Sequence, residues 1–424
     1  MEINGAKMFV KALQEEGVDT LFAYPGGTAI DLFDALYDAE GIDMILPRHE
    51  QALVHAADGY ARSTGRVGVC LVTSGPGATN LVTGIATANY DSVPLVCFTG
   101  QVPMNLIGND AFQEVDIVGI TRSICKYAVT VRKREDLARI IKNAFYIART
   151  GKPGPVVVDI PKDIQLAMGS DEYPTEVNIR GYKPSEGVHV GQIKRALAEL
   201  KNAKKPVFLC GGGVNIAHAR KEMQELAEKT GIPVVTTIMG KGAIPTDHPL
   251  YVGNIGIHGN MASNKAIMES DVLFSIGCRF NDRITGTIDT FAKNAKIIHV
   301  DIDAASISRN IKVDIPIVAD AKVAISKMLE YAEPLDIKGW VDDIMNVKAE
   351  YPINMNRYDG VTPEAIIRTI NDMYSNLIVT TDVGQNQLWT TQYIDIDENK
   401  QLLTSGGLGT MGYGFPAAIG AKLG

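Results

Sequence analysis

A glutamate stands where an apolar run leads into a predicted helix. Glu50 follows the apolar residues 44–46 and precedes residues 53–62, which have helical character. A carboxyl group beside apolar residues can hold a proton and share it with a ligand nitrogen, which is general acid–base chemistry. The same glutamate could instead only complement the positive N-terminal end of the helix dipole. The local sequence leaves both interpretations open.

Two glycine-rich turns follow predicted strands in the first part of the chain. The first reads Tyr24-Pro25-Gly26-Gly27-Thr28, and the second reads Ser74-Gly75-Pro76-Gly77-Ala78-Thr79-Asn80. Glycine lets a backbone approach a ligand closely, and the start of a helix presents free N–H groups. The turns are therefore candidates for ligand contact, although plain strand-to-helix connections would use the same residue types.

A third glycine-rich segment lies in the middle of the chain and is compatible with a dinucleotide. Gly211-Gly212-Gly213 follows a predicted strand but lacks the third glycine of the G-x-G-x-x-G fingerprint. Arginines in residues 277–283 could fork onto phosphate, and Asp301 could bind ribose hydroxyls, because both follow predicted strands. The alternative is an ordinary cluster of surface ion pairs.

Other catalytic chemistries find little support. His49, His55 and His258 show no metal-ligand spacing with carboxylates, so we interpret them as structural. No G-x-S-x-G motif and no Cys/His nucleophile pair stands out. The cysteines are scattered without a C-x-x-C pair, which argues against disulfides or a zinc site and predicts reduced, buried thiols. They are Cys70, Cys97, Cys125, Cys210 and Cys278.

Composition narrows the class of protein. The formal net charge is −8, which argues against sequence-independent nucleic-acid binding, because such binding needs a basic surface. Hydrophobic residues make up 46% and charged residues 21% of the chain, as expected for a globular protein with a core. No apolar run is long enough to span a bilayer, and the N-terminus does not resemble a signal peptide. We therefore expect a soluble, cytoplasmic protein of several domains.

The elements that would position these residues alternate between short apolar strands and longer amphipathic segments. We expect strands at residues 67–73, 95–99, 156–160, 207–210, 234–238, 272–277, 297–301 and 377–381, apolar on both faces. Among the helices, residues 192–200 place Ile193, Ala196, Leu197 and Leu200 on one stripe. The pattern predicts an α/β fold of tandem doubly wound parallel sheets.

Two irregular stretches divide the chain. Residues 166–189 lack a sustained period and are predicted to be a linker, while residues 332–361 begin with Glu333-Pro334 and end in a polar, irregular stretch at 354–360. A helix then opens with Thr362 as N-cap, Pro363 in the first turn and Glu364 near the positive end of the dipole. We predict three domains, at 1–165, 190–332 and 361–424. The third is too short to complete a sheet of the same kind, so we expect the chain to be cut off there.

Taken together, these segments resemble the large catalytic subunit of acetolactate synthase (acetohydroxyacid synthase), a thiamine-diphosphate enzyme. The matching segments run along the whole chain, and the AFQE and RFNDR segments point to the flavin-containing biosynthetic branch. They are residues 22–27 (FAYPGG), 48–51 (RHEQ), 56–62 (AADGYAR), 73–80 (TSGPGATN), 100–103 (GQVP), 110–114 (DAFQE), 154–163 (GPVVVDIPKD), 279–283 (RFNDR) and 405–414 (SGGLGTMGYG).

The resemblance implies a reaction and a role for Glu50. Residues 1–165 would form the pyrimidine-binding domain, 190–332 a flavin-binding domain, and 361–424 the start of the diphosphate-binding domain. Glu50 would hydrogen-bond to the aminopyrimidine ring nitrogen of thiamine diphosphate and so activate the cofactor. The enzyme would decarboxylate pyruvate and join the two-carbon unit to pyruvate or 2-oxobutyrate, giving an acetohydroxy acid in branched-chain amino-acid biosynthesis.

The resemblance also assigns the remaining site residues. Those on the thiamine diphosphate side are Tyr24, Pro25, Gly27, Pro76, Asn80, Gln113, Val383, Gly384, Gln385, Asn386, Gly409 and Met411. Those near the substrate entrance are Phe112, Gln113, Lys162 and Arg283. Those at a largely structural FAD are Lys152, Gly211, Gly212, Gly213, Thr237, Ile238, Met239, Gly240, His258, Gly259, Gly277, Cys278, Arg279, Asn281, Arg283, Asp301, Ile302 and Asp320.

The chain departs from the family pattern at several positions. Lys152 stands where the family has arginine, Asn386 where histidine is usual, and Asn281 where aspartate is usual. The family continues beyond Gly424 into the aspartate and asparagine that hold Mg²⁺, so the resemblance implies no metal ligands in this chain. We accordingly expect the chain to be inactive alone.

Partners and rival functions follow from the same resemblance. It implies a homodimer or homotetramer, with active sites between subunits, a possible regulatory small subunit, and 2-keto acid substrates; no nucleic acid or membrane partner is implied. The alternative enzymatic function is that of another flavin-containing thiamine-diphosphate enzyme, such as pyruvate oxidase or glyoxylate carboligase. Glyoxylate carboligases lack a glutamate at the position of Glu50. A non-catalytic flavin-binding fragment is the rival from another class.

Overall fold

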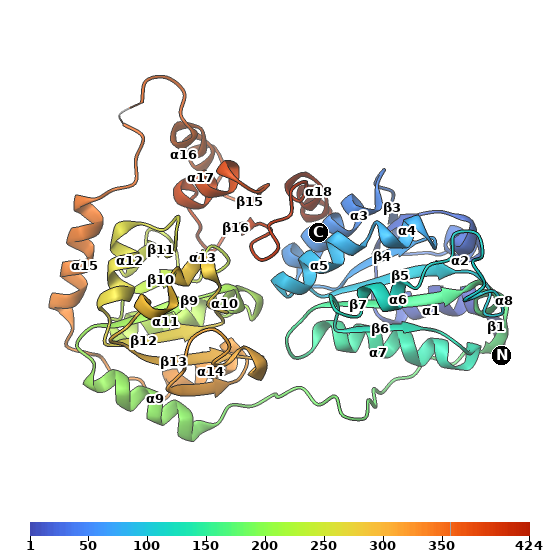
Figure 1. Cartoon of the computed structure of the whole chain (residues 1–424), viewed down its shortest axis with the longest axis horizontal. Coiled ribbons are helices and arrows are strands. Elements are labelled where there is room, and N and C mark those ends of the chain that lie inside the picture. Colours follow the sequence, from blue (N-terminus) through green and yellow to red (C-terminus); the bar gives the residue numbers. More distant parts are fainter. Residues whose placement is uncertain (357) are drawn as a thin grey trace. The chain divides into compact units, whose positions relative to one another are not determined.

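A computed structural model of the chain describes residues 1–356 and 358–424, which form two compact units. The first unit comprises Met1–Pro184 with Ser405–Gly424, and the second comprises Ser185–Thr404. Each contains a central sheet with flanking helices (Figure 1). The three domain boundaries expected from the sequence remain predictions, and Arg357, within the second irregular stretch, lies outside the described residues.

The first unit contains a six-stranded parallel sheet, as the sequence predicts. The strand order is β3-β2-β4-β5-β7-β6, and every neighbouring pair is parallel. Its central strands β4, β5 and β7 are fully buried, because both faces of the sheet are covered. The strands are β2 (Thr20–Tyr24), β3 (Asp43–Ile45), β4 (Gly68–Val72), β5 (Leu95–Gln101), β6 (Tyr127–Thr130) and β7 (Pro155–Pro161).

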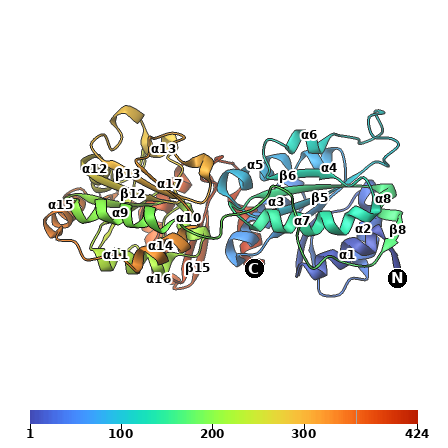
Figure 2. The ribbon, with the colours of Figure 1, turned by 90° about the horizontal axis from the view of Figure 1, so that it is seen from below.

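Helices cover both faces of this sheet, which makes it doubly wound. The helices α1, α2 and α7 pack with alternate strand residues such as Leu71 and Phe98 in one core, and α3 and α5 pack with Cys70 and Cys97 in another. Figure 2 shows α1 and α4 on opposite sides of the strands. The helices are α1 (Gly5–Glu15), α2 (Ile30–Tyr37), α3 (Glu50–Thr64), α4 (Pro76–Thr79), α5 (Val82–Asp91), α6 (Ile117–Thr121), α7 (Leu137–Arg149), α8 (Lys162–Leu166) and α18 (Gly414–Leu423), with 3-10 turns Gly27–Ala29 and Arg134–Asp136.

The second unit contains another six-stranded parallel sheet. Its order is β11-β10-β9-β12-β13-β14, so the first strand along the chain, β9, lies in the middle. This is the order of dinucleotide-binding folds of the Rossmann type. The strands are β9 (Pro206–Cys210), β10 (Val234–Thr236), β11 (Tyr251–Asn254), β12 (Val272–Ile276), β13 (Lys296–Asp301) and β14 (Ile315–Val318).

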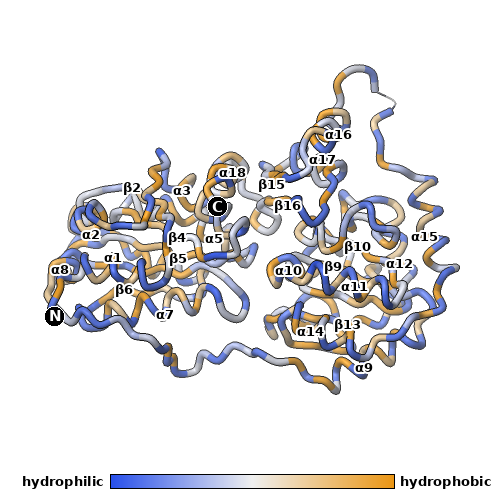
Figure 3. Tube along the Cα trace, turned by 180° about the vertical axis from the view of Figure 1, so that it is seen from behind, coloured by the Kyte–Doolittle hydropathy of each residue, from blue (hydrophilic) through white to orange (hydrophobic). Residues whose placement is uncertain are grey.

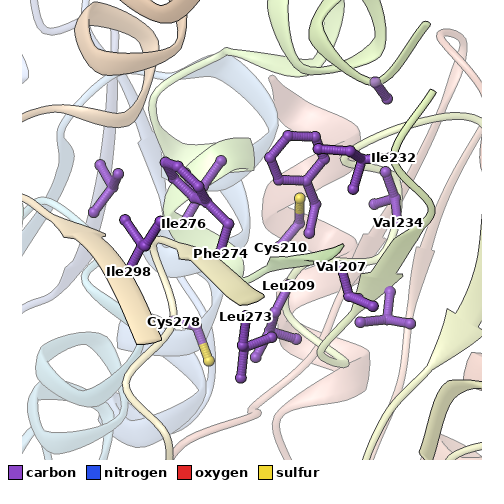
Figure 4. Packing of buried hydrophobic residues seen from close by; sticks show 14 of the residues in the cluster. Val207, Leu209, Cys210, Ile232, Val234, Leu273, Phe274, Ile276, Cys278 and Ile298 are labelled. Carbon is purple, nitrogen blue, oxygen red and sulfur yellow. The ribbon is translucent and has the colours of Figure 1, made fainter. Parts of the chain in front are cut away.

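One hydrophobic core joins this sheet to its helices. Val207, Leu209 and Leu273 lie on one face of the sheet and Phe274 on the other, as Figure 4 shows. The predicted stripe on the first helix is confirmed, because Ile193, Ala196 and Leu200 are buried and Leu197 packs partly against the core. The helices are α9 (Val190–Asn202), α10 (Gly212–Ile216), α11 (Arg220–Thr230), α12 (Met261–Glu269), α13 (Asp282–Thr285), α14 (Ala321–Leu329) and α15 (Lys338–Glu350), with 3-10 turns Ile288–Thr290 and Ala304–Ser306.

A smaller layer completes the second unit. The strands β15 (Leu377–Thr380) and β16 (Lys400–Leu403) pair in parallel, and the helices α16 (Pro363–Met373) and α17 (Gln385–Tyr393) pack on each other. The predicted start of α16 is confirmed: the Thr362 side chain accepts the N–H of Ala365, with Pro363 and Glu364 in the first turn. The strand β15 is only half-buried, so the prediction of a strand apolar and buried on both faces is wrong there.

Both stretches that divide the chain contain regular structure. Residues 168–170 form β8 (Met168–Ser170), which pairs antiparallel with β1 (Glu2–Asn4). In this pairing Glu2 lies opposite Ser170. The helix α15 lies within the second of these stretches, and it buries Trp340 and Ile344 against the core. Hydrophobic and hydrophilic residues are mixed along this helix (Figure 3).

Two further expectations concern thiols and membranes. All five cysteines are free; four are buried, as predicted, and Cys125 is half-buried. Over the described ranges 1–356 and 358–424, no helix is long and apolar enough to cross a bilayer.

Candidate functional site

The first sheet reverses its strand order between β2 and β4, and both glycine-rich turns leave the sheet there. The strand β2 ends at Tyr24 and β4 ends at Val72, and these two residues are register partners. In open α/β sheets, ligands bind outside the carboxyl ends of the strands at such a switch point. The fold thus brings the turn with Pro25 and Gly27 to the edge where the turn with Pro76 and Asn80 begins.

Two threonines join these turns. The hydroxyl oxygens of Thr28 and Thr73 lie 3.0 Å apart, and the N–H of Ser74 donates to the Thr28 hydroxyl at 3.0 Å. A Cβ added to Gly26 would lie 2.5 Å from the Thr73 Cβ, so only glycine fits there. The two turns therefore form one rigid edge.

Glu50 stands at this edge, at the first residue of α3. The His49 imidazole caps the helix by accepting the Gln51 N–H, which fixes where the helix begins. The Asn80 side-chain amide donates a 2.9 Å hydrogen bond to Oε2 of Glu50. A Cβ added to Gly77 would lie 2.7 Å from Cγ2 of Thr73 and at an ordinary contact distance of 3.5 Å from Oε1, so this glycine is a neighbour of that oxygen. Among residues 1–356 and 358–424 no donor reaches Oε1, and the half-buried carboxylate keeps one free acceptor.

The segment 102–116 reaches the same edge. Gln113 has φ 59°, and a Cβ added to Gly75 would lie 2.8 Å from the Gln113 carbonyl oxygen. Phe112, beside it, exposes 87% of its surface. The predicted substrate residues Phe112 and Gln113 are thus neighbours of the second glycine-rich turn.

Lys162 approaches the first turn from the end of β7. Its Nζ donates to the Gly27 carbonyl oxygen at 3.2 Å and lies 3.5 Å from Oδ2 of Asp31. The ammonium is about one-third exposed, so it can also meet an anion from solvent.

The C-terminal segment that carries Gly409 and Met411 packs on α3. The Tyr413 hydroxyl donates to Oδ1 of Asp58 at 2.7 Å. The Arg62 guanidinium lies between two carboxylates: its Nε is 2.7 Å from the same Asp58 oxygen, and its Nη2 is 3.0 Å from Oδ2 of Asp91. Burial raises the pKa of Tyr413 well above its usual value. Met411 itself is largely exposed, with 80% of its surface accessible.

In the second unit, the glycine-rich segment also lies at a switch point. Gly211 follows β9 and Gly277 follows β12, the two strands between which the order reverses. The Gly213 N–H donates to the Gly277 carbonyl oxygen at 3.1 Å, and a Cβ added to Gly211 would lie 2.1 Å from that oxygen. These glycines are therefore required by close backbone packing at the edge where a dinucleotide would bind. Gly212 and Cys278 flank this contact.

The turn with Thr237, Ile238, Met239 and Gly240 lies beside this edge. The Thr237 N–H donates to the Cys210 carbonyl oxygen at 3.0 Å. The Asn215 amide donates to the Met239 carbonyl oxygen at 2.9 Å, and the Arg220 Nε donates to the Asn215 side chain at 3.0 Å. The turn is thus fixed by side chains of α10 and α11.

A second group of FAD-side residues surrounds Asn281. The segment with His258 and Gly259 meets Arg283, because the Ile257 N–H donates to the Arg283 carbonyl oxygen at 3.0 Å. Oδ1 of Asn281 is buried and has no hydrogen-bond partner among the described residues. An orphaned buried acceptor is costly, so this oxygen fits a donor from a bound ligand.

The remaining FAD-side residues have varied surroundings. Oδ1 of Asp301 accepts the Asp303 N–H at 2.8 Å, and Asp320 caps α14 by accepting the N–H groups of Lys322 and Val323. Ile302 is half-buried, as are Arg279 and Lys152, and Lys152 belongs to the first unit.

Of the predicted diphosphate residues, Val383 and Gly384 follow β15, and Gln385 and Asn386 begin α17. Gly384 has φ 93° and occupies the N-cap position of α17, so the N–H groups of this nine-residue helix begin at Gln385. The Asn386 side chain accepts the Asp382 N–H at 3.0 Å and so holds the turn that contains Val383.

Sequence reasoning missed several residues that shape these sites. They are Thr28 and Thr73, which lie far apart in the chain, the ion cluster of Asp58, Arg62 and Asp91, and the local pair of Asn215 and Arg220. The only local signal was the i, i+4 spacing of Asp58 and Arg62 on one helix. The buried His299, whose pKa burial lowers to about 4, gave no signal at all.

Comparison with known proteins adds family relationships. Residues 3–120 match the N-terminal TPP binding domain of the thiamine pyrophosphate enzymes, 193–328 their central domain and 382–424 their C-terminal TPP binding domain. The chain is 48% identical to the probable acetolactate synthase large subunit of Methanococcus aeolicus, over 99% of this chain and 74% of that relative. It is 46% identical to the acetolactate synthase large subunit of Corynebacterium glutamicum, over 100% of this chain and 69% of the relative. With the acetolactate synthase isozyme 3 large subunit of Escherichia coli it shares 45% identity, over 99% of this chain and 75% of that protein.

Proposed function

The chain belongs to the family of acetolactate synthase large subunits, which are thiamine pyrophosphate (thiamine diphosphate) enzymes, and from that premise we propose its reaction. It decarboxylates pyruvate and transfers the two-carbon unit to a second 2-keto acid. Pyruvate as acceptor gives 2-acetolactate, and 2-oxobutyrate gives 2-aceto-2-hydroxybutyrate. Both products serve branched-chain amino-acid biosynthesis.

The free Oε1 acceptor of Glu50 carries this proposal. It lies at the switch point of the first sheet, beside a glycine, while Asn80 holds the other carboxylate oxygen. An acceptor in this position suits the ring nitrogen of an aminopyrimidine, and a carboxyl group there can hold and return the proton. If Glu50 only complemented the helix dipole, the Asn80 contact would not be needed.

The surrounding residues orient the cofactor's pyrimidine side. The pair of Thr28 and Thr73 holds the two turns together, so Tyr24, Pro25, Gly27 and Pro76 present a fixed edge to a flat ring. When bound, thiamine diphosphate supplies the electron sink for loss of carbon dioxide from a 2-keto acid. Asn80 keeps the Glu50 carboxylate in one orientation. Gly409 and Met411 are assigned to the same cofactor from the family resemblance alone.

Lys162, Phe112 and Gln113 form the substrate side. The partly exposed Lys162 ammonium can attract the carboxylate of a 2-keto acid, since the carbonyl of Gly27 and the carboxylate of Asp31 hold it in place. Phe112 offers an exposed apolar face for the methyl or ethyl group of the substrate. Arg283, in the second unit, is assigned to the substrate side from the family resemblance alone.

FAD fits the second unit. The sheet has the Rossmann strand order, the glycines lie at its switch point, and Asn281 offers an unpaired buried acceptor. Gly211, Gly277 and the turn at residues 237–240 would then lie along the dinucleotide. A flavin absorption spectrum in the purified protein tests this assignment.

The diphosphate of the cofactor suits residues 383–386, because the N-terminus of α17 presents free N–H groups to an anion. Magnesium is a different case. Within the described chain no group of three or more histidine, cysteine, aspartate or glutamate side chains could hold a metal ion.

Partners and location complete the proposal. The relatives are named large subunits, which supports a regulatory small subunit for this chain as well. We propose a homodimer or homotetramer in the cytoplasm, in keeping with the family.

The test is formation of acetolactate from pyruvate with thiamine diphosphate, Mg²⁺ and FAD. We expect residues 1–424 alone to form no acetolactate, because the resemblance implies no Mg²⁺ ligands within them. In a chain that also carries those ligands we expect acetolactate from the wild type and a loss of about 100-fold or more for Glu50→Gln, because general acid–base groups contribute about 10²–10⁴-fold. Glu222→Gln is the matched control, since Glu222 is also an acid in the first turn of a helix. Equal activity of the two variants would contradict the role of Glu50. Consumption of an electron acceptor without acetolactate would instead indicate an oxidase.

A further inference from the structure

A buried carboxylate in the first sheet has no part in the site described above. Asp159 is the fifth residue of β7 and is 1% exposed. Its neighbours along the strand are Val158 and Ile160, both fully buried. A charged group in such surroundings is tolerated only with good hydrogen-bond partners.

Three side chains donate hydrogen bonds to the Asp159 carboxylate: one from each neighbouring strand, β5 and β6, and one more from the end of β5. Thr99 and Thr130 are its register partners on β5 and β6, and their hydroxyls donate to it at 2.7 Å and 3.1 Å. The third donor is Nε2 of Gln101, at 3.2 Å. Gln101 is the last residue of β5 and is 3% exposed.

Gln101 connects the carboxylate to both ends of segment 102–116. Its Nε2 also donates to the Val115 carbonyl oxygen at 3.0 Å, and its Oε1 accepts the Val102 N–H at 2.9 Å. One side chain thus holds the first residue of the segment and one near its end. This closes the segment into a loop fixed on Asp159.

The loop carries the proposed substrate residues at its far side. Glu114 braces it internally by accepting the N–H groups of Gly108 and Ala111, and Asp163 accepts the Met104 N–H at 3.1 Å. Phe112 and Gln113 sit between these braces and the glycine-rich turn at Gly75. The position of both residues therefore depends on how the loop ends are held.

We propose that Asp159, acting through Gln101, is a positioning residue that fixes the loop of residues 102–116 and so sets the substrate side of the site. The loop-fixing part stands on the contacts above, and the substrate part rests on the proposed function.

The charge of Asp159 adds a pH dependence to the loop. Burial raises the pKa of Asp159 to about 6, and the nearby Asp116 carboxylate at the start of α6 acts in the same direction. The groups that face it are the hydroxyls of Thr99 and Thr130 and the amide of Gln101. When the carboxyl is protonated, either hydroxyl can turn and accept the proton, but the Gln101 NH₂ group can only donate. The Gln101 contact therefore weakens below pH 6.

Hydrogen exchange of the loop tests the fixing directly, in the full chain with its cofactors. At pH 7.5 we expect Gln101→Met to speed exchange of peptides covering residues 102–116 by about tenfold, because the two hydrogen bonds between Gln101 and the loop ends are lost. Asp159→Asn should do the same to a smaller extent. After correction for intrinsic rates, the wild type should loosen between pH 7 and pH 5, and Asp159→Asn should show no such change.

The matched control is Thr130→Val. It removes one donor to Asp159 but leaves Gln101 and the loop ends in place. Loop exchange in Thr130→Val should equal that of the wild type. If Gln101→Met leaves loop exchange unchanged, or if Thr130→Val loosens the loop as much, the positioning role is wrong.

Kinetics tests the substrate part. We expect the KM for pyruvate to rise about tenfold in Gln101→Met while kcat changes less, and the double variant with Asp159→Asn to add little, since both act through one contact. A loosened loop with unchanged KM would overturn the substrate part. Failure of the wild type to form acetolactate would overturn the proposed function, while the exchange result still decides the loop.

Discussion

The Asn80 amide holds one oxygen of the Glu50 carboxylate at 2.9 Å and leaves the other beside Gly77. The two residues come from different elements, since Glu50 begins α3 and Asn80 ends the short helix α4. The contact gives the carboxylate one orientation before any ligand arrives. Such preorganisation is what a group needs when it must meet a ring nitrogen in a fixed geometry.

Asn80→Ala should reduce acetolactate formation about 10- to 100-fold. A hydrogen bond to a charged group is worth about 1.5–3 kcal/mol, and its loss lets the carboxylate turn away from the cofactor. Steady-state kinetics at saturating thiamine diphosphate measures the effect. Thr79→Ala is the control, because Thr79 adjoins Asn80 and makes only a 3.3 Å contact with the Pro76 carbonyl oxygen. Equal activity of both variants would contradict this orienting role.

The ion cluster under Tyr413 should dominate the stability of the first unit. Arg62→Met leaves the carboxylates of Asp58 and Asp91 buried without their cation, which costs about 3–5 kcal/mol. Arg139→Met removes an exposed pair with Asp136 and should change stability by less than about 1 kcal/mol. Urea unfolding measures both variants, and similar midpoints for the two would show that the buried cluster has no special weight.

Glycine packing between α3 and α18 gives a steric prediction. A Cβ added to Gly59 would lie 2.1 Å from the Ala417 carbonyl oxygen, so Gly59→Ala should force the helices apart at a cost of about 1–3 kcal/mol. Gly339→Ala meets no atom within 4 Å in α15 and should be neutral or stabilising by about 0.5–1 kcal/mol. Thermal unfolding distinguishes the two. A Gly59→Ala protein as stable as the wild type would contradict the close packing.

His299 should make the second unit sensitive to acid. Burial lowers its pKa to about 4, although Asp301 lies 3.7 Å away. Below pH 6.5 the unfolded chain binds a proton that the folded chain does not, so stability falls from pH 6.5 to pH 4 by up to about 3 kcal/mol and is fully present above that range. His299→Gln should remove this part of the pH dependence in urea unfolding. An unchanged slope in the variant would assign the effect to other groups.

The sequence predicts the sheets better than the connections. Strands such as β4 and β7 are apolar on both faces, and that pattern alone identifies buried parallel strands. The helix α15 was missed because its buried face consists mainly of Trp340 and Ile344 among charged residues. The strand β8 was missed because its partner, β1, lies at the opposite end of the unit in sequence.

The site divides in the same way. Glu50 and the two glycine-rich turns could be chosen from the sequence, because each follows an apolar run and carries residue types with a local meaning. Asn80 and Thr28 lie in these turns, but only the family resemblance gave Asn80 a role, and Thr28, Gln101 and Asp159 were given none. Their contacts depend on strand order and register, which local patterns do not specify. The only sequence signal for Asp159 is that it is an acidic residue within an otherwise apolar strand.

The most direct measurement is the rate of hydrogen–deuterium exchange at C2 of thiamine diphosphate bound to the protein, followed by quenched-flow NMR. Glu50 is the proposed cofactor-activating group. The Glu50→Gln variant should therefore bind thiamine diphosphate yet slow this exchange about 100-fold or more. Exchange at the wild-type rate in Glu50→Gln, with cofactor bound, would contradict the account.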